Sequence, residues 1–327
     1  MATSGKTTGL GSTSLRIPLH KPIIITNGLV EPHPNVKIDE PSTPPKRRHF
    51  SYSQLATYLR CSMQYYFRYV KNEQDRKNLA MAVGSGVHAA LEWNAKKKIG
   101  TKLDLSLPDL QDLTSDMVEI EAQGVDETDK AIGTEKDKAI NAVTLFRRRD
   151  AAKIRPLAAE HSFKLVVPPN DQYPEENLPV IGYIDMIGEV PRTVEVPGPT
   201  AKIIVIEDYK WVRQQRSQAE IDTTPQLDIY DLAIHEETGM TLDAIGLRQF
   251  GFKKEGPFAN ALYRSRALLT PSMRFMRWER VRQQIREVQD AIRKGIFIPT
   301  DDSKTCSWCP YRQICQFSLV STSDATP

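Results

Sequence analysis

The four cysteines of this chain are so unevenly placed that they limit how it can fold. Cys61 stands alone, whereas Cys306, Cys309 and Cys315 fall within ten residues near the other end. Four thiolates at one site bind either a tetrahedral zinc ion or an iron–sulfur cluster, and a shared site would bring the two ends together. A single C-x2-C pair is less like zinc, whose ribbons usually supply two pairs. Four unrelated cysteines remain a third interpretation.

Length and composition favour a soluble protein of ordinary globular type. The 327 residues are 40% hydrophobic and 26% charged, which allows one large domain or two small ones with a sizeable core. No apolar run approaches the ~18–20 residues that span a bilayer, and the N-terminus lacks the apolar stretch of a secretory signal. We therefore expect no membrane association and a cytoplasmic location. The net charge of +3 is too small to indicate nucleic-acid binding by itself.

The composition changes along the chain and predicts three regions. Residues 1–48 are rich in Ser, Thr, Gly and Pro, and we interpret them as a disordered arm with one short strand at Ile23–Thr26. Residues 49–318 form the folded domain, and 319–327 are expected to be a disordered tail. Within the domain, residues 101–135 are acidic and poor in large apolar side chains. They are predicted to be an exposed, partly helical insertion.

Hydrophobic periodicity predicts the order of helices and strands within the domain. Helices are expected from a cap at Ser53 to Val70, over 83–98, over 136–150, over 224–238 and from Pro271 to residue 294. Strands are expected at 158–167, 180–190, 202–210, 243–252 and 260–268. This order predicts an α/β fold with a central mixed sheet flanked by helices.

Two carboxylates and a lysine stand in the predicted strand segments GYIDMI and IEDYK, at Asp185, Asp208 and Lys210. Because side chains alternate along a strand, Asp208 and Lys210 project to one face and Tyr209 to the other. Carboxylates hold a hard divalent cation that activates water, and a lysine can orient that water or stabilise developing charge. The pattern is compatible with phosphodiester chemistry. Its plainer alternative is a salt bridge at the end of a strand.

Three further helical positions are candidates for the same site. His88 follows Gly84 and Gly86, whose lack of a side chain permits close approach of the helix to another element. Gln226 and Tyr230 are four residues apart, so both can address one groove. Taken alone, His88 is more simply a packing residue, and the other two belong to an ordinary amphipathic helix.

The predicted helix 271–294 carries seven basic residues against three acidic ones. Basic side chains that neutralise phosphates give affinity without sequence specificity, so this helix is a candidate DNA contact. The alternative is a solvated face, and apolar residues such as Trp278 and Ile285 indicate that part of the helix belongs to the core.

Read in order, these segments resemble the RecB-like branch of the PD-(D/E)XK nucleases, and especially its iron–sulfur members. Those include the AddB nuclease domain and CRISPR-associated and phage exonucleases. The matching segments are SYSQLATYLRCSMQYYFRYV, GSGVHAALEW, GYIDMI, EDYK, QLDIY and CSWCPYRQIC. The resemblance runs from Phe50 to about Phe317. One departure is Trp211, which follows Lys210 where a small Thr or Ser is usual.

The resemblance implies a restriction-endonuclease-like sheet and a role for each matched residue. Asp185, Asp208 and His88 would hold Mg²⁺ or Mn²⁺, with Glu160 as a looser match for an additional acid. Lys210 would assist the attacking water, while Gln226 and Tyr230 would shape the site or contact DNA. The residues that would hold a 4Fe–4S cluster are Cys61, Cys306, Cys309 and Cys315. This cluster would close a loop of 244 intervening residues and act as a structural staple.

The function implied is that of a metal-dependent deoxyribonuclease. We expect an exonuclease that acts on single-stranded DNA or DNA ends in recombination, replication or repair. It would act in a bacterial cell, with a phage or a bacterial gene as its source. The chain has no Walker phosphate loop, so unwinding would need a helicase or recombination protein as partner. One alternative is a catalytically inactive iron–sulfur module that binds DNA or a helicase. Another is a structural protein stapled by zinc.

Overall fold

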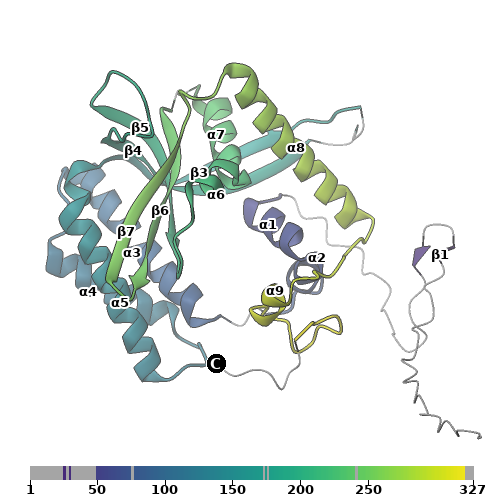
Figure 1. Ribbon diagram of the computed structural model, residues 1–327. Coiled ribbons are helices and arrows are strands. Elements are labelled where there is room, and N and C mark those ends of the chain that lie inside the picture. The colour runs from purple at the N-terminus through teal and green to yellow at the C-terminus, as the bar shows by residue number, and fades with distance from the viewer. Residues whose placement is uncertain are drawn as a thin grey trace, which may run out of the picture. The chain divides into compact units, whose positions relative to one another are not determined.

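The computed structural model describes residues 25–26, 29–30, 49–74, 77–171, 174, 177–239 and 242–320 (Figure 1). The chain divides into two compact units, residues 1–43 and residues 44–327. In the first unit the described elements are two antiparallel strands, β1 (Ile25–Thr26) and β2 (Leu29–Val30). The predicted arm and tail otherwise lie outside the described residues, apart from positions 319 and 320.

A five-stranded mixed sheet forms the centre of the second unit. Its strands lie in the order β3 (Arg155–Val167), β4 (Leu178–Pro191), β5 (Lys202–Trp211), β6 (Ala244–Lys253) and β7 (Gly256–Ser265). All neighbours are antiparallel except β5 and β6. A parallel pair needs a crossover, which α6 (Gln218–Thr223) and α7 (Pro225–Thr238) supply. The predicted mixed α/β sheet is confirmed.

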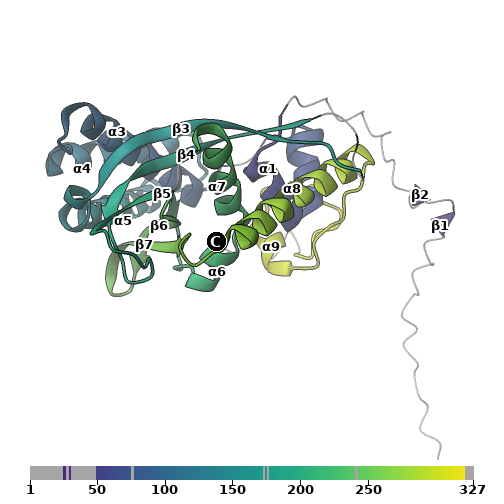
Figure 2. The same cartoon turned by 90° about the horizontal axis from the view of Figure 1, so that it is seen from above.

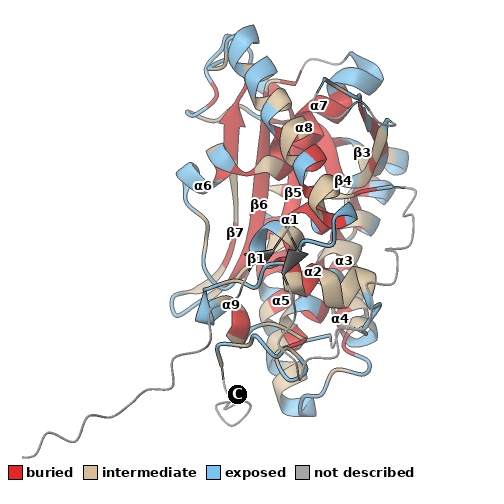
Figure 3. Cartoon of the chain, turned by 90° about the vertical axis from the view of Figure 1, so that its right-hand side faces the viewer, coloured by how far each residue is buried: buried red, intermediate tan, exposed pale blue. Residues whose placement is uncertain are grey.

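Helices cover both faces of this sheet (Figures 1 and 2). One face packs against α3 (Leu79–Thr101), α4 (Leu107–Glu121) and α5 (Asp129–Arg149). The other packs against α1 (Tyr52–Arg60), α7 and α8 (Pro271–Arg293). The strands between them are largely buried (Figure 3). Short elements complete the unit: α2 (Ser62–Tyr65), the π-helical turn η1 (Tyr66–Val70), the 3₁₀ turn η2 (Ala151–Lys153) and α9 (Ser303–Ser307).

The predicted first helix differs from the observed one at its start and in its continuity. Ser51, rather than Ser53, caps α1, because its hydroxyl accepts a hydrogen bond from the Gln54 backbone N–H. The helix is also interrupted at Cys61, whose backbone is extended with φ −162° and ψ 108°. The chain then resumes as α2 and η1. Cys61 therefore lies at a break between helices and not within one.

The expectation that residues 101–135 are an exposed insertion is wrong for the inner face of α4. Leu110 and Val118 are both 0% exposed, and Thr114 between them is also buried. These residues recur every four positions, so a narrow stripe packs onto α3 although the segment as a whole is polar. The average composition of residues 101–135 does not reveal this stripe, because most of the segment is polar. The segment belongs to the helical layer and contributes to the core.

A matched pair of glycines in α3 allows a direct test of this packing. A Cβ at Gly86 would lie 2.7 Å from backbone atoms of Val118, whereas one at Gly84 would lie 3.5 Å from Trp211 Cβ, an ordinary contact. We expect Gly86→Ala to destabilise the protein by about 1–3 kcal/mol because α3 and α4 must separate. Gly84→Ala should be neutral or stabilise by up to about 1 kcal/mol through helix propensity. Urea unfolding of both variants measures the difference, and equal midpoints would contradict the packing described.

Candidate active site

The candidate site lies where β4 and β5 separate. Their antiparallel pairing runs from Pro191 and Lys202 to Met186 and Glu207 and stops there. At the next position, the Asp185 side chain replaces the ladder, because its Oδ2 accepts a hydrogen bond from the Tyr209 backbone N–H at 2.5 Å. Beyond this point β5 continues beside β6 alone. At this point a side chain of β4 thus bonds the backbone of β5 in place of a ladder pair.

Asp208 and Lys210 project from β5 to the same face, as strand alternation predicts. Lys210 Nζ lies 2.6 Å from Asp208 Oδ2. Tyr209 packs on the opposite face among the core residues beneath α3. Burial lowers the pKa of Lys210, but the Asp208 carboxylate outweighs it and the pKa is raised. Lys210 is therefore a charged ammonium held beside a carboxylate.

Helix α7 brings Gln226 and Tyr230 onto the other oxygen of Asp208. Gln226 Nε2 donates to Asp208 Oδ1 at 2.8 Å, and the Tyr230 hydroxyl donates to the same atom at 3.0 Å. Gln226 Nε2 also lies 2.8 Å from the Tyr230 hydroxyl oxygen. Burial raises the pKa of Tyr230, and the charges of Asp208 and Asp185 add to the shift, so Tyr230 stays protonated as a donor. The two side chains fix the orientation of the carboxylate.

His88 reaches the site from α3. Its Nδ1 lies 3.3 Å from Asp185 Oδ2. Burial lowers the pKa of His88, but the hydrogen bond and negative charge of Asp185 outweigh it and raise the pKa. Burial likewise raises the pKa of Asp185, yet His88 and the Tyr209 N–H bring it below its usual value. His88 of α3 and Asp185 of β4 thus form a polar pair that joins the helical layer to the sheet.

Glu160 lies opposite Asp185 on β3 with an unusual backbone. Its φ is +50°, a left-handed conformation that a non-glycine residue adopts at a cost. The pairing of β3 and β4 passes from His161 and Ile184 to Ala159 and Met186, so Glu160 and Asp185 form no ladder pair. Burial raises the pKa of Glu160, and the charge of Asp185 adds to the shift. Strain and carboxylate crowding coincide at this point, a combination typical of functional sites.

The donor chemistry of this cluster suits a hard divalent cation. Within the described residues, no three His, Cys, Asp or Glu side chains are grouped closely enough to surround a metal ion as they stand. The donors are nevertheless of the right type, namely carboxylates of Asp185, Asp208 and Glu160 with one imidazole from His88. In the described part of the chain, buried Asp208 Oδ2 accepts no well-directed hydrogen bond and faces only Lys210 Nζ. These residues fit Mg²⁺ or Mn²⁺ by chemistry.

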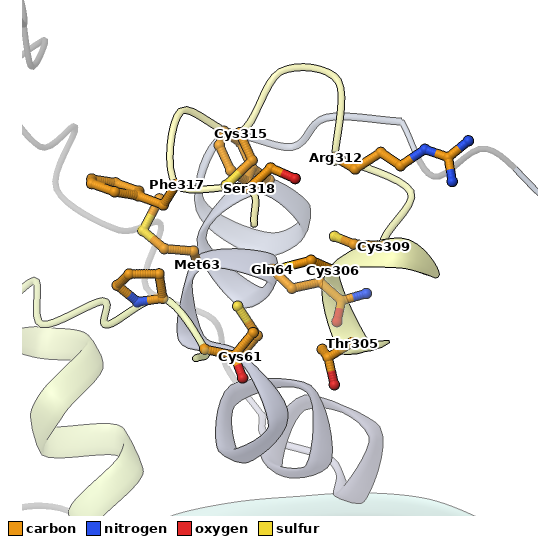
Figure 4. Close-up of a pocket in the computed structure, with 13 residues that line it drawn as sticks. Cys61, Met63, Gln64, Thr305, Cys306, Cys309, Arg312, Cys315, Phe317 and Ser318 are labelled. Atoms are coloured by element: carbon orange, nitrogen blue, oxygen red, sulfur yellow. The ribbon is translucent and has the colours of Figure 1, made fainter. Parts of the chain in front are cut away.

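The four cysteines line one pocket (Figure 4). Cys61 comes from the break between α1 and α2, and the other three come from α9 and the turns that follow it. Burial raises the pKa of the Cys309 thiol, while a hydrogen bond from the Tyr311 backbone N–H lowers it and the other three cysteines raise it further. Residues far apart in sequence thus line one pocket.

Aromatic contacts join this pocket to the rest of the unit. The Tyr311 ring packs 5.6 Å from the ring of Phe67 in η1. The guanidinium of Arg213, three residues beyond Lys210, lies 5.1 Å from the centre of the Trp308 ring. The cysteine segment therefore contacts both the N-terminal helices and the chain leaving β5.

Helix α8 is the candidate DNA contact, but most of its arginines have partners within the protein. Arg282 forms ion pairs with Glu236 and Glu279, and Arg286 donates to the backbone carbonyl of Pro168 at 2.6 Å. Arg280 and Arg293 are exposed. The solvated or structural interpretation therefore holds for much of this helix.

A buried ionic cluster on the opposite face was not anticipated. Glu207 is 0% exposed, and Arg248 of β6 donates to both its carboxylate oxygens at 2.6 Å. The Tyr263 hydroxyl donates to Glu207, and Asp150 lies 3.1 Å from Arg248. The available signal was a charged residue within each apolar strand segment, IIVIED and IGLRQF. Because Arg248 and Glu207 are distant in sequence, their pairing follows only from the parallel register of β5 and β6.

Comparison with known families agrees with this fold. A family model described as the PD-(D/E)XK nuclease superfamily matches residues 49–316. The chain belongs to this superfamily. Comparison with curated proteins gives no match. Among the described helices, none combines the length and apolar character needed to cross a membrane.

Proposed function

We propose that this protein is a metal-dependent DNA nuclease of the RecB-like branch. The observation that carries the proposal is the convergence of Asp185, Asp208 and Lys210 where β4 and β5 separate, within a chain of this superfamily. A catalytically inactive binding module would not need Lys210 held at 2.6 Å from Asp208, or Asp208 oriented by two donors from α7. The presence of all three residues, Asp185, Asp208 and Lys210, therefore favours an enzyme over an inactive binding module.

In the proposed site each side chain has a distinct role. Asp185, Asp208 and His88, with Glu160 as an additional acid, would hold Mg²⁺ or Mn²⁺. When bound, such an ion polarises a phosphate and lowers the pKa of a coordinated water. The Lys210 ammonium would orient the attacking water and balance the charge that develops on the phosphate oxygens. Gln226 and Tyr230 would keep the Asp208 carboxylate in one orientation.

We further propose an exonuclease that acts on single strands or DNA ends, as the resemblance to iron–sulfur exonucleases implies. An exonuclease needs an end, so a linear single strand should be degraded with Mn²⁺ while a closed circular strand of the same sequence persists. Gel analysis of both substrates measures this difference, and a labelled 5′ or 3′ end gives the polarity. Cleavage of the circle at the same rate would contradict the exonuclease assignment and leave an endonuclease.

The cysteine pocket is proposed to hold a 4Fe–4S cluster that staples the two ends of the domain. Support comes from four thiols lining one pocket and from a backbone N–H directed at Cys309, since such hydrogen bonds stabilise cluster thiolates. Anaerobically purified protein should contain about four iron atoms per chain. Cys309→Ala should lose this iron and unfold at a lower temperature, whereas Ser307→Ala should retain both. Zinc in place of iron, or an iron-free variant of full stability, would contradict the proposal.

A partner protein follows from the reaction and is part of the same proposal. A nuclease for single strands needs unpaired DNA, and the sequence has no phosphate loop with which to drive unwinding. We therefore infer cooperation with a helicase or recombination protein in DNA recombination, replication or repair.

A further inference from the structure

The segment that leaves β5 is fixed beside the candidate site by a buried glutamine. Gln249 of β6 is 0% exposed and pairs in register with Lys210. Its Oε1 accepts a hydrogen bond from the Arg216 backbone N–H at 2.6 Å, and its Nε2 donates to the Arg216 carbonyl at 3.5 Å. Both ends of one buried amide are thus used to hold the backbone of a single loop residue.

This use of Gln249 needs a reason, because burying an amide costs free energy unless its hydrogen bonds are made. Most neighbours of Gln249 in the interior of β6 are apolar, such as Leu247 and Phe250. An apolar residue in its place would leave the backbone of Arg216 without these two partners. The arrangement therefore positions Arg216 relative to the strand that carries Lys210.

The charge of Arg216 also distinguishes it from other arginines of this unit. Arg248, Arg264 and Arg266 each lie within 3 Å of a carboxylate oxygen. Within the described part of the chain, half-buried Arg216 has no carboxylate at ion-pair distance. Glu220, which lies nearby in sequence, is bonded instead to the backbone N–H and hydroxyl of Ser217, at 2.8 and 2.9 Å.

Arg216 is held near the strand position of Lys210, because Gln249 bonds the Arg216 backbone and pairs in register with Lys210. Burial lowers the pKa of Lys210, and the positive charge of Arg216 acts in the same direction, although the Asp208 and Asp185 carboxylates outweigh both. A half-buried guanidinium that forms no ion pair with the described residues, on a loop held beside the strand of Lys210, is available to bind an anion. A guanidinium is the side chain best matched to the oxygens of a phosphate.

We propose that Arg216 binds a backbone phosphate of the DNA strand next to the phosphodiester that is cleaved, and that Gln249 is its positioning residue. This inference rests on the proposed function, since it assigns a substrate contact to that site. The proposed phosphate contact lies on the chain that leaves β5. It does not lie on α8, where most of the arginines bind partners within the protein.

Binding of a fluorescein-labelled oligo(dT) strand in EDTA tests the proposal without any cleavage. We expect Arg216→Ala to weaken affinity about 10-fold, the loss of one charge-assisted hydrogen bond. The dependence of log K on log salt should become shallower by about 0.7, the loss of one phosphate contact on a single strand. Arg216→Lys should retain the salt dependence with part of the affinity. Arg148→Ala, an exposed arginine of α5, is the matched control and should change neither.

Gln249→Leu tests the positioning role separately. It should weaken binding while leaving most of the salt dependence, because the charge remains but is no longer held in place. Unchanged affinity and salt dependence in Arg216→Ala would overturn the proposal even if the wild type cleaves DNA. Arg216→Ala could also show the expected losses of affinity and salt dependence while the wild type never cleaves DNA with Mn²⁺. That result would uphold the phosphate contact and refute the nuclease function. A wild type without affinity for the strand would also overturn the proposal, and so would an Arg216→Ala variant that binds more weakly with an unaltered salt dependence.

Discussion

Lys210→Ala should reduce DNA cleavage by about 100- to 1000-fold, the usual cost of removing one preorganised electrostatic group from an active site. The physical reason is that the Lys210 ammonium, held 2.6 Å from Asp208, is placed to balance the charge that develops on the phosphate. The initial rate of cleavage of an end-labelled strand at saturating Mn²⁺ measures the effect.

Lys202→Ala is the matched control for this substitution, because Lys202 is exposed at the opposite end of the same strand. Its rate should equal that of the wild type. The unfolding temperature of Lys210→Ala should fall little, so that loss of activity is separated from loss of structure. A Lys210→Ala variant within fivefold of the wild-type rate would remove Lys210 from the proposed mechanism.

Arg248→Met should lower the free energy of unfolding by about 3–5 kcal/mol, the largest stability effect we expect from a single substitution. Glu207 is fully buried, and Arg248 supplies both of its guanidinium hydrogen bonds. Removal of the arginine leaves an uncompensated carboxylate between the sheet and α5, to which the Tyr263 hydroxyl alone would still donate among the described residues. Urea unfolding at neutral pH measures the change.

The double variant Glu207→Gln with Arg248→Met separates lost packing from an orphaned charge. It removes both charges, so it should recover a large part of the stability lost in the single variant. If the single variant costs less than about 1 kcal/mol, or if the double variant is worse than the sum of its parts, the buried pair is not the stabilising feature described.

The parts of the fold that local sequence determines could be predicted. Helix α7 ends at Thr238, the last residue of the predicted helix 224–238, and α8 begins at Pro271, as predicted. The common face of Asp208 and Lys210 follows from strand alternation alone. These features depend on residues within one helical turn or one strand of each other, which is the range over which sequence patterns act.

Features that depend on packing between distant segments could not be predicted in the same way. The stripe on α4 can be recognised as buried only when α3 is placed beside it. The interruption of the helix at Cys61 likewise depends on the residues that pack around this cysteine. Within the site, the left-handed backbone of Glu160 and the grip of Gln249 on Arg216 arise from sheet register. No local motif predicts either of these two features, because both are set by neighbours about 25 or more positions away.

The most direct test of the central claim is whether the wild-type protein hydrolyses DNA in a metal-dependent way. Anaerobically purified protein would be incubated with an end-labelled single strand in Mn²⁺, in Mg²⁺ and in EDTA, and the release of labelled product followed with time. The arrangement of Asp185, Asp208, His88 and Lys210 predicts cleavage with either ion and none in EDTA. An intact strand under all three conditions, from protein that is folded and carries its cluster, would contradict the account and indicate a binding module in place of a nuclease.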